Sequence, residues 1–224
     1  MIGSLMYLVT CTRPDLAFTV SVLPEFSSHP LEIHHHAVKR VFRYLVGTNN
    51  LSLVYPRLSD QPGQTGQMRL IGFSDAAYGN CLDTRRSWSR YCFYLSNCLI
   101  SWMSKKQILV ATSTTDAEYV ALSLASRQAM WYIQGFNEMD ITIPIILRCD
   151  NTASIHIANN PIISPRTNHI DIHYYYIRER LIAKEFELQY IPTDDNTSDI
   201  FTKGLEAKKY AMFTIRLGLS STTR

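Results

Sequence analysis

Four acidic side chains stand where a catalytic cation site could be built. Asp75 follows an apolar segment that predicts a β-strand, and Glu118 lies in the first turns of a predicted long helix. Asp150 ends a strongly apolar segment, and Asp199 opens a predicted helix near the C-terminus. In a mixed α/β sheet, strand ends and helix N-termini can converge on one edge. Converging carboxylates repel, so they need cations, and hard oxygen ligands suit Mg²⁺ or Mn²⁺.

Such a cluster would support phosphodiester hydrolysis, because two ions about 3.5–4 Å apart can activate a water and stabilise a leaving oxygen. Each acid also has an ordinary structural interpretation. An Asp at a strand end is commonly a turn or cap residue, and an acid in the first turn of a helix is favoured by the helix dipole. The residue types alone leave both interpretations open.

The elements that must position these acids are indicated by the spacing of apolar residues. Residues 1–50 predict three helices, with Pro14 and Pro30 near helix starts and Pro24 at a kink or an end. Strands are predicted at 51–55, 68–73, 91–95, 99–102, 143–149 and 186–191, with a further short strand at 108–111. Helices are predicted at 115–136, 152–158 and 169–183, followed by one or two closing helices.

Three clustered strands before a helix imply an antiparallel meander, and the later strand–helix alternation implies a parallel continuation. The predicted fold class is therefore α/β, with a mixed sheet flanked by helices. No internal repeat is present, and residues 57–67 predict a polar loop.

Composition excludes several classes of protein. The chain has 224 residues, 46% of them hydrophobic, and a net charge of +3. This is enough apolar material for a packed core, and the charge is too small for a general polycation, so a polyanion would need a local basic patch. No apolar run reaches the roughly 18 residues of a membrane span, and no charged leader begins the chain. Five cysteines without a CxxC pair argue against a disulfide scaffold or a thiolate zinc site and favour a reducing compartment.

Short sequence phrases around the four acids carry a family resemblance that runs in order over nearly the whole chain. They are residues 74–76 (SDA), 101–107 (SWMSKKQ), 113–119 (STTDAEY), 149–151 (CDN), 166–172 (RTNHIDI) and 199–203 (DIFTK). Together they resemble the ribonuclease H domain of copia-type LTR retrotransposon Pol polyproteins. Residues 3–8 (GSLMYL) and 12–15 (TRPD) resemble the end of the reverse transcriptase portion that precedes it.

The resemblance implies a ribonuclease H-like mixed five-stranded sheet flanked by helices in residues 51–224. Residues 1–50 would be a small helical remnant of the reverse transcriptase connection region. The resemblance also implies two Mg²⁺ ions, with Mn²⁺ as a substitute, and endonucleolytic cleavage of RNA in RNA–DNA hybrids. The metal-binding and catalytic acids would be Asp75, Glu118, Asp150 and Asp199. Glu118 is preferred over Asp116, because Ala121 follows it at the family's spacing.

Further expectations follow from the same resemblance. Partners would be the RNA–DNA hybrid and other parts of a Pol polyprotein, with no membrane. The location would be intracellular, either cytoplasmic in virus-like particles or nuclear. Selectivity for RNA would come from 2′-hydroxyl contacts in the wide minor groove. Phosphate contacts are expected from two pairs of adjacent cations, for which a merely solvated face is the alternative, and from one single arginine, Arg166. These candidates are Arg85, Arg86, Lys105, Lys106 and Arg166.

Several residues depart from the family pattern. They are Ala77 where an Asp is usual, Tyr78 for Trp, Trp88 for Thr, Arg90 for Gly and Asn168 for Lys. A charged residue at the glycine position of a hairpin is expected to strain the turn. The loss of a cation at Asn168 removes one charge near the expected duplex path. None of these departures replaces an expected metal ligand.

Histidines offer weaker candidates. Three consecutive helical side chains point about 100° apart, so residues 34–36 (HHH) cannot chelate one ion together. His169 and His173 stand one helical turn apart with Asp171 between them, but no third ligand supports zinc. No catalytic histidine is assigned, because no mobile histidine loop is evident between Ile191 and Asp199.

Two other functions compete with the nuclease. A truncated, catalytically silent remnant would fold and at most bind nucleic acid, and the absent YxDD motif predicts no polymerase activity. A transposase or integrase shares the general fold but orders its acids Asp-Asp-Glu. Here the order is Asp, Glu, Asp, Asp, which argues against that class.

Overall fold

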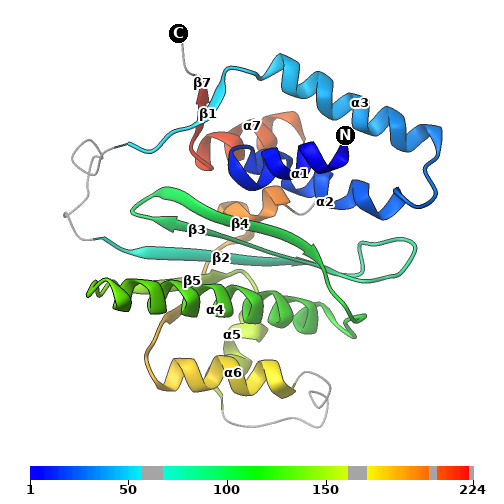
Figure 1. The fold of residues 1–224 in the computed structure, drawn as a ribbon. Coiled ribbons are helices and arrows are strands. Elements are labelled where there is room, and N and C mark those ends of the chain that lie inside the picture. Colours follow the sequence, from blue (N-terminus) through cyan, green and yellow to red (C-terminus); the bar gives the residue numbers. More distant parts are fainter. Residues whose placement is uncertain (57–67, 161–170, 202–205, 222–224) are drawn as a thin grey trace.

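The computed structural model describes residues 1–56, 68–160, 171–201 and 206–221. These residues form a layered α/β structure in which helices cover both faces of a central sheet (Figure 1). Helices from the two ends of the chain lie on one face, and the helices that connect the parallel strands lie on the other. None of the helices within the described ranges is long and apolar enough to cross a bilayer.

The central sheet has five strands in the order β4-β3-β2-β5-β6. The strands are β2 (Leu70–Ala77), β3 (Trp88–Leu95), β4 (Cys98–Lys106), β5 (Ile145–Cys149) and β6 (Glu187–Tyr190). β2, β3 and β4 form an antiparallel meander, while β5 and β6 add in parallel beside β2. The β3–β4 turn places Ser96 and Asn97 at φ of 47° and 69°, the positive values that a tight hairpin turn requires. The predicted mixed sheet is confirmed.

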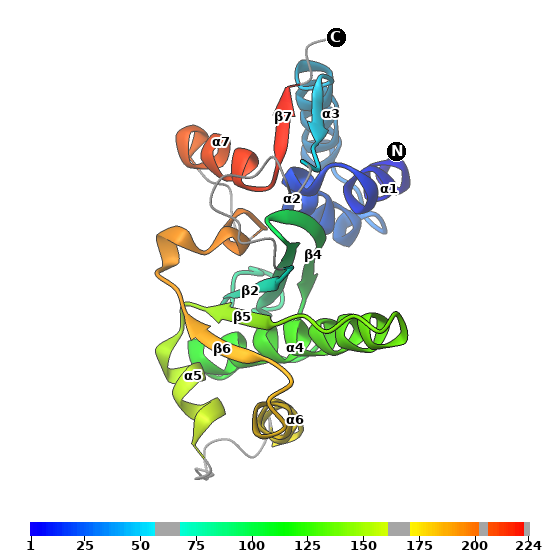
Figure 2. The same ribbon diagram turned by 90° about the vertical axis from the view of Figure 1, so that its left-hand side faces the viewer.

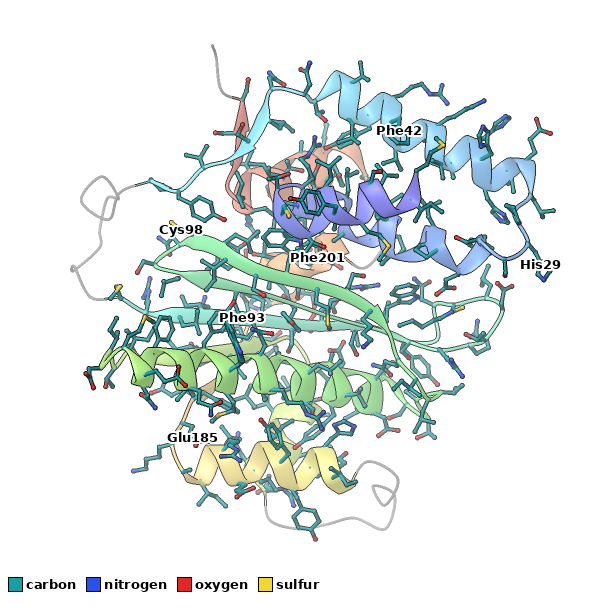
Figure 3. The ribbon with its side chains drawn as sticks, viewed as in Figure 1. His29, Phe42, Phe93, Cys98, Glu185 and Phe201 are labelled. Atoms are coloured by element: carbon teal, nitrogen blue, oxygen red, sulfur yellow. The ribbon has the colours of Figure 1, made fainter. Side chains whose placement is uncertain are left out.

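One face of the sheet is covered by α4 (Thr114–Glu138), with α5 (Thr152–Asn159) and α6 (Asp171–Ile182) packed beside it. The core between them includes Phe93, which Figure 3 labels between the sheet and α4. Gly72 permits this packing, because a Cβ there would stand only 2.5 Å from a Phe93 ring carbon. Strand β2 therefore lies tightly under the long helix that carries Glu118.

The other face of the sheet is covered by segments from both chain ends, and Figure 2 shows them on the side away from α4 and α6. The N-terminal helical elements are α1 (Ile2–Cys11), η1 (Pro14–Leu16), α2 (Ala17–Val22), η2 (Leu23–Phe26) and α3 (Glu32–Gly47). The C-terminal ones are η5 (Thr193–Asp195), η6 (Thr197–Phe201) and α7 (Ala207–Arg216). Phe201 enters the core on this side (Figure 3).

The N-terminal helices share this core rather than standing apart from it. Ala17 packs in the same apolar cluster as Phe73 and Phe213. The indole Nε1 of Trp102 on β4 donates a 2.9 Å hydrogen bond to the carbonyl of Val9. The predicted division after residue 50 stays a prediction, and the structure places extensive packing across it.

Several predicted elements differ from the observed ones. Residues 108–111 form no strand, and β1 (Leu51–Leu53) pairs with β7 (Leu219–Ser221) rather than with the main sheet. β2 continues through Ala77, so Asp75 lies inside the strand and not at its end. The reason is that β3 pairs with β2 as far as Ala77 and Trp88.

Candidate active site

Asp75 lies on the sheet face that looks toward the chain ends. Phe73, two residues earlier, belongs to the core on that face, and alternate residues of a strand share a face. The Asp75 side chain is mostly buried and pairs with Arg90, whose Nη1 lies 3.3 Å from its Oδ2. Its carboxylate also lines a surface cavity of about 210 Å³. Asp199, Tyr78 and Thr193 line the same cavity.

Glu118 reaches the site from the opposite face, in the second turn of α4. The helix begins at Ser113, whose hydroxyl accepts a 3.1 Å hydrogen bond from the backbone NH of Asp116. Glu118 is only 9% exposed, and its Oε2 has no hydrogen-bond partner among the described residues. Burial, and then the charges of Asp75 and Asp150, raise the pKa of Glu118 well above its ordinary value. This carboxyl therefore needs a nearby cation to stay charged at low cost.

Asp150 follows β5 directly and brings a third carboxylate to the same site. Donor atoms of Glu118, Cys149 and Asp150 all lie within 4.8 Å of one another. Asn151 fixes this turn, because its side-chain oxygen accepts a 2.8 Å bond from the backbone NH of Ser154 and so begins α5. Burial raises the pKa of the Cys149 thiol, so this sulfur is protonated in the absence of an ion.

Asp199 comes from η6, a short 3₁₀ segment rather than the α-helix predicted there. Asn196 anchors that segment to the sheet, because its Nδ2 donates a 3.0 Å hydrogen bond to the carbonyl of Ser74. The Asp199 carboxylate is buried, and its Oδ2 lies 3.1 Å from Nζ of Lys209 on α7. The structure thus brings all four predicted acids together, beside the C-terminal part of β2 and the end of β5.

The four carboxylates have unequal surroundings. Asp75 and Asp199 each already face a protein cation, Arg90 and Lys209 respectively. Glu118 and Asp150 form no ion pair within the described part of the chain, and the buried Oε2 of Glu118 is unsatisfied. Hard oxygen donors left in this state fit a divalent cation. The residues therefore fit a metal ion on the Glu118–Asp150 side.

The sequence analysis expected Arg90 to lie in a hairpin and strain its turn, and this expectation was wrong. Arg90 is the third residue of β3 and the register partner of Asp75, and its φ is not positive, so it does not strain a turn. Its side chain is fully buried, and its guanidinium carbon stands 5.6 Å from the ring centre of Phe18. Burial lowers the pKa of Arg90 to about 9, although the charges of nearby acids oppose that shift. Arg90 therefore keeps its positive charge at neutral pH.

The predicted phosphate-binding cations have different surroundings. Arg85 and Lys105 are exposed, and Arg86 is half-buried. Lys106 is held by an ion pair, with its Nζ 2.7 Å from a carboxylate oxygen of Glu25. Arg166 lies outside the described residues. Of the four predicted candidates that lie in the described residues, Arg85 and Lys105 are the most exposed to solvent.

The remaining candidates are placed as follows. Asp116 bonds to the hydroxyl of Thr112 at the start of α4, while Glu118 faces the acid cluster. His173 has its Nδ1 2.7 Å from the Ser123 hydroxyl, and burial, followed by the charge of Arg127, lowers its pKa. His169 and Asn168 lie outside the described residues. Neither Asp116 nor His173 contributes to the acid cluster.

Comparisons with known proteins identify relatives of the whole chain. No protein-family model matches the chain. The chain is 34% identical over 98% of its length to the retrovirus-related Pol polyprotein of transposon TNT 1-94 from Nicotiana tabacum. It is 33% identical over 98% of its length to that of transposon RE1 from Arabidopsis thaliana. It covers only 16% and 15% of these two relatives.

Among solved structures, ribonuclease H1 of Halobacterium salinarum aligns with a TM-score of 0.44 at 16% identity. That alignment covers 58% of this chain and 90% of the other. Because this structural likeness is weak, the fold assignment rests on the strand order, the strand directions and the Pol relatives. On those grounds the chain belongs to the Pol polyproteins of copia-type retrotransposons, and its mixed five-stranded sheet flanked by helices is a ribonuclease H-like fold.

Proposed function

We propose that this chain is a ribonuclease H-type nuclease that cleaves RNA within RNA–DNA hybrids, using divalent metal bound at the cluster formed by Asp75, Glu118, Asp150 and Asp199. The observation that carries the proposal is the convergence of these carboxylates beside β2 and the end of β5, with a buried and unsatisfied oxygen on Glu118. Mg²⁺ suits such oxygen ligands, and Mn²⁺ is the natural substitute.

The chain's own residues would bind the metal ion and orient the RNA–DNA hybrid. Glu118 and Asp150 would hold a cation between α4 and β5, and Asp75 and Asp199, each paired with a protein cation, would line the cavity beside the reacting phosphate. A bound divalent cation would supply a more acidic water and neutralise charge on the phosphodiester. Arg85 and Lys105, both exposed, would contact phosphates of the hybrid. RNA would be distinguished by its 2′-hydroxyls.

Cleavage of a labelled RNA–DNA hybrid tests this function. Purified protein should cleave the RNA strand in Mg²⁺ or Mn²⁺ and leave single-stranded RNA and duplex DNA intact. Asp150→Asn and Glu118→Gln should each lower the rate by about 100-fold or more, because each removes a charged ligand.

The matched control is Glu138→Gln, which changes an exposed glutamate near the far end of α4. It should cleave like the wild type. Equal rates for wild type and Asp150→Asn would overturn the proposed roles of the acids.

A silent remnant is the second candidate, and one observation favours it. Arg90 occupies the space beside Asp75 that a cation would otherwise use, with 3.3 Å between Nη1 and Oδ2. A protein of this kind would bind the hybrid with unchanged affinity in Asp150→Asn and show no cleavage in either form. A gel-shift titration beside the cleavage assay separates the two candidates.

A further inference from the structure

Arg90 is placed against the acid cluster by the backbone itself. It is the antiparallel partner of Asp75 in the β2–β3 ladder, so the two Cα atoms stand directly opposite each other. Cys92, two residues on, belongs to the core on the chain-end face, so Arg90 points to that face as Asp75 does. The guanidinium is thus delivered to Asp75 by strand register and does not depend on a flexible loop.

The surroundings of Arg90 hold it in place. Its side chain is 0% exposed, and Phe18 of α2 covers the guanidinium at 5.6 Å. Trp88 packs edge-on against the same Phe18 ring, with 6.3 Å between ring centres. Swinging the guanidinium away would expose this aromatic pair and bury an uncompensated carboxylate. Arg90 is therefore a permanent cation of the folded protein, unlike an ion that exchanges with solvent.

Charge is distributed unevenly over the cluster as a result. Arg90 pairs with Asp75, and Lys209 pairs with Asp199 at 3.1 Å. Glu118 and Asp150 have no such partner in the described residues, and Oε2 of Glu118 is buried without a hydrogen bond. The Asp75–Asp199 side of the cluster is neutralised, and within residues 1–56, 68–160, 171–201 and 206–221 no cation forms an ion pair on the Glu118–Asp150 side.

We propose that Arg90 is a built-in counter-ion that takes the place of one divalent cation beside Asp75, so that this chain binds a single divalent ion, between Glu118 and Asp150. The inference rests on the proposed function only in assuming that the open carboxylates bind a divalent cation. It predicts that the site binds one divalent ion where the family resemblance implies two. It also predicts that the protein stays folded when the metal is removed.

Counting bound Mn²⁺ tests this inference without any activity measurement. Arg90→Met keeps much of the side-chain volume and removes the charge, whereas Arg90→Lys restores a charge. Titration followed by the electron paramagnetic resonance of free Mn²⁺ should give one ion per wild-type chain and two per Arg90→Met chain. Arg90→Lys should bind one ion.

Thermal unfolding gives a second readout for the same variants. In EDTA, Arg90→Met should unfold roughly 5–10 °C below the wild type, because removing one partner of a buried pair leaves the other uncompensated. Mn²⁺ should recover most of that loss. The control is Arg13→Met, which breaks a buried pair with Asp15 (2.8 Å) that contacts none of the four acids. It should lower Tm with no added recovery in Mn²⁺.

The outcomes separate this inference from the proposed function. Two ions on the wild type, or one ion on both wild type and Arg90→Met, would overturn the counter-ion role and leave the metal site standing. No ion on either protein would overturn both. If Arg90→Met does not fold, the wild-type and Arg90→Lys counts still decide, since two ions on either of them contradict the inference.

Discussion

Glu118 is the residue at which burial and charge conflict most strongly. Its carboxyl is nine-tenths buried, and two neighbouring acids add to the cost of ionising it. A carboxyl whose pKa is raised by folding stabilises the protein below its unfolded pKa, near 4.5, and that stability is lost as pH rises through the folded pKa. The metal-free protein therefore carries an electrostatic cost at neutral pH that a bound cation would relieve.

Glu118→Gln should remove that cost. In EDTA at pH 7, we expect the variant to unfold at a higher temperature than the wild type. The gain in the free energy of unfolding should be about 1–3 kcal/mol. At pH 4 the difference should shrink, because Glu118 is then neutral in the folded wild type and mostly neutral in the unfolded one. Thermal unfolding of both proteins at the two pH values measures it.

The control for this comparison is Glu138→Gln, on the same helix but exposed. It should show no such dependence on pH. A Glu118→Gln variant that is less stable than the wild type at pH 7 in EDTA would contradict the assignment of a charge conflict at this residue.

Among the elements, η6 is the short one on which the site depends, because it carries Asp199. It is a five-residue 3₁₀ segment, and Asn196 just before it bonds to the β2 carbonyl of Ser74. The Asn196 side-chain oxygen also accepts bonds from the hydroxyl (2.5 Å) and the backbone NH (3.3 Å) of Ser198. One fully buried amide thus ties the segment bearing Asp199 to the strand bearing Asp75.

Asn196→Ala should loosen this segment more than it damages the rest of the fold. We expect a loss of about 1–3 kcal/mol in the free energy of unfolding, because buried polar groups lose their partner. Hydrogen exchange should quicken at residues 197–201 and stay unchanged along α4. The control is Asn159→Ala, whose exposed amide bonds the carbonyl of Ile155 at the end of α5. Unchanged exchange at 197–201 in Asn196→Ala would contradict the anchoring role.

The sequence predicted the elements well where apolar periodicity is long. The helix predicted at 115–136 is observed at Thr114–Glu138, and the strand predicted at 143–149 is observed at Ile145–Cys149. It missed β7, because a three-residue strand that pairs with residues far away carries no local signal. The exposed apolar residues 108–111 were wrongly assigned to a strand for the same reason, since strand-like composition does not show whether a pairing partner exists.

The sequence was enough to name the acids of the candidate site, but it was not enough to name the cations that pair with them. The four carboxylates follow from their places on predicted elements and from the family resemblance. The pairing of Arg90 with Asp75 depends on the β2–β3 register, and that of Lys209 with Asp199 depends on how α7 packs. Such long-range relations are absent from local sequence. The one available signal was a charged residue at a position where the family has glycine.

Contacts between segments that are distant in sequence hold the two ends of the chain together. β1 pairs with β7 across the two ends of the chain, and Tyr210 of α7 donates a 3.0 Å hydrogen bond to the carbonyl of Asp15. Ala17 joins the core cluster that holds Ile71 and Phe201. The N-terminal helices thus cover an apolar sheet face that residues 51–224 alone would leave partly exposed.

Removing residues 1–50 should therefore destabilise the remaining chain even though every acid of the site is retained. Exposed apolar surface costs about 25 cal/mol per Å², so uncovering several core side chains outweighs the small stability margin of a domain. We expect the 51–224 fragment to bind a hydrophobic dye, to associate in solution and to unfold at a lower temperature than the full chain. Dye fluorescence, light scattering and thermal unfolding measure these three effects. Trp102→Phe in the full chain is the milder companion, because it removes the 2.9 Å bond to Val9 and part of the indole packed against the core, and it should cost about 1–3 kcal/mol. A monomeric fragment as stable as the full chain would show instead that the ribonuclease H region folds independently of the helices before it.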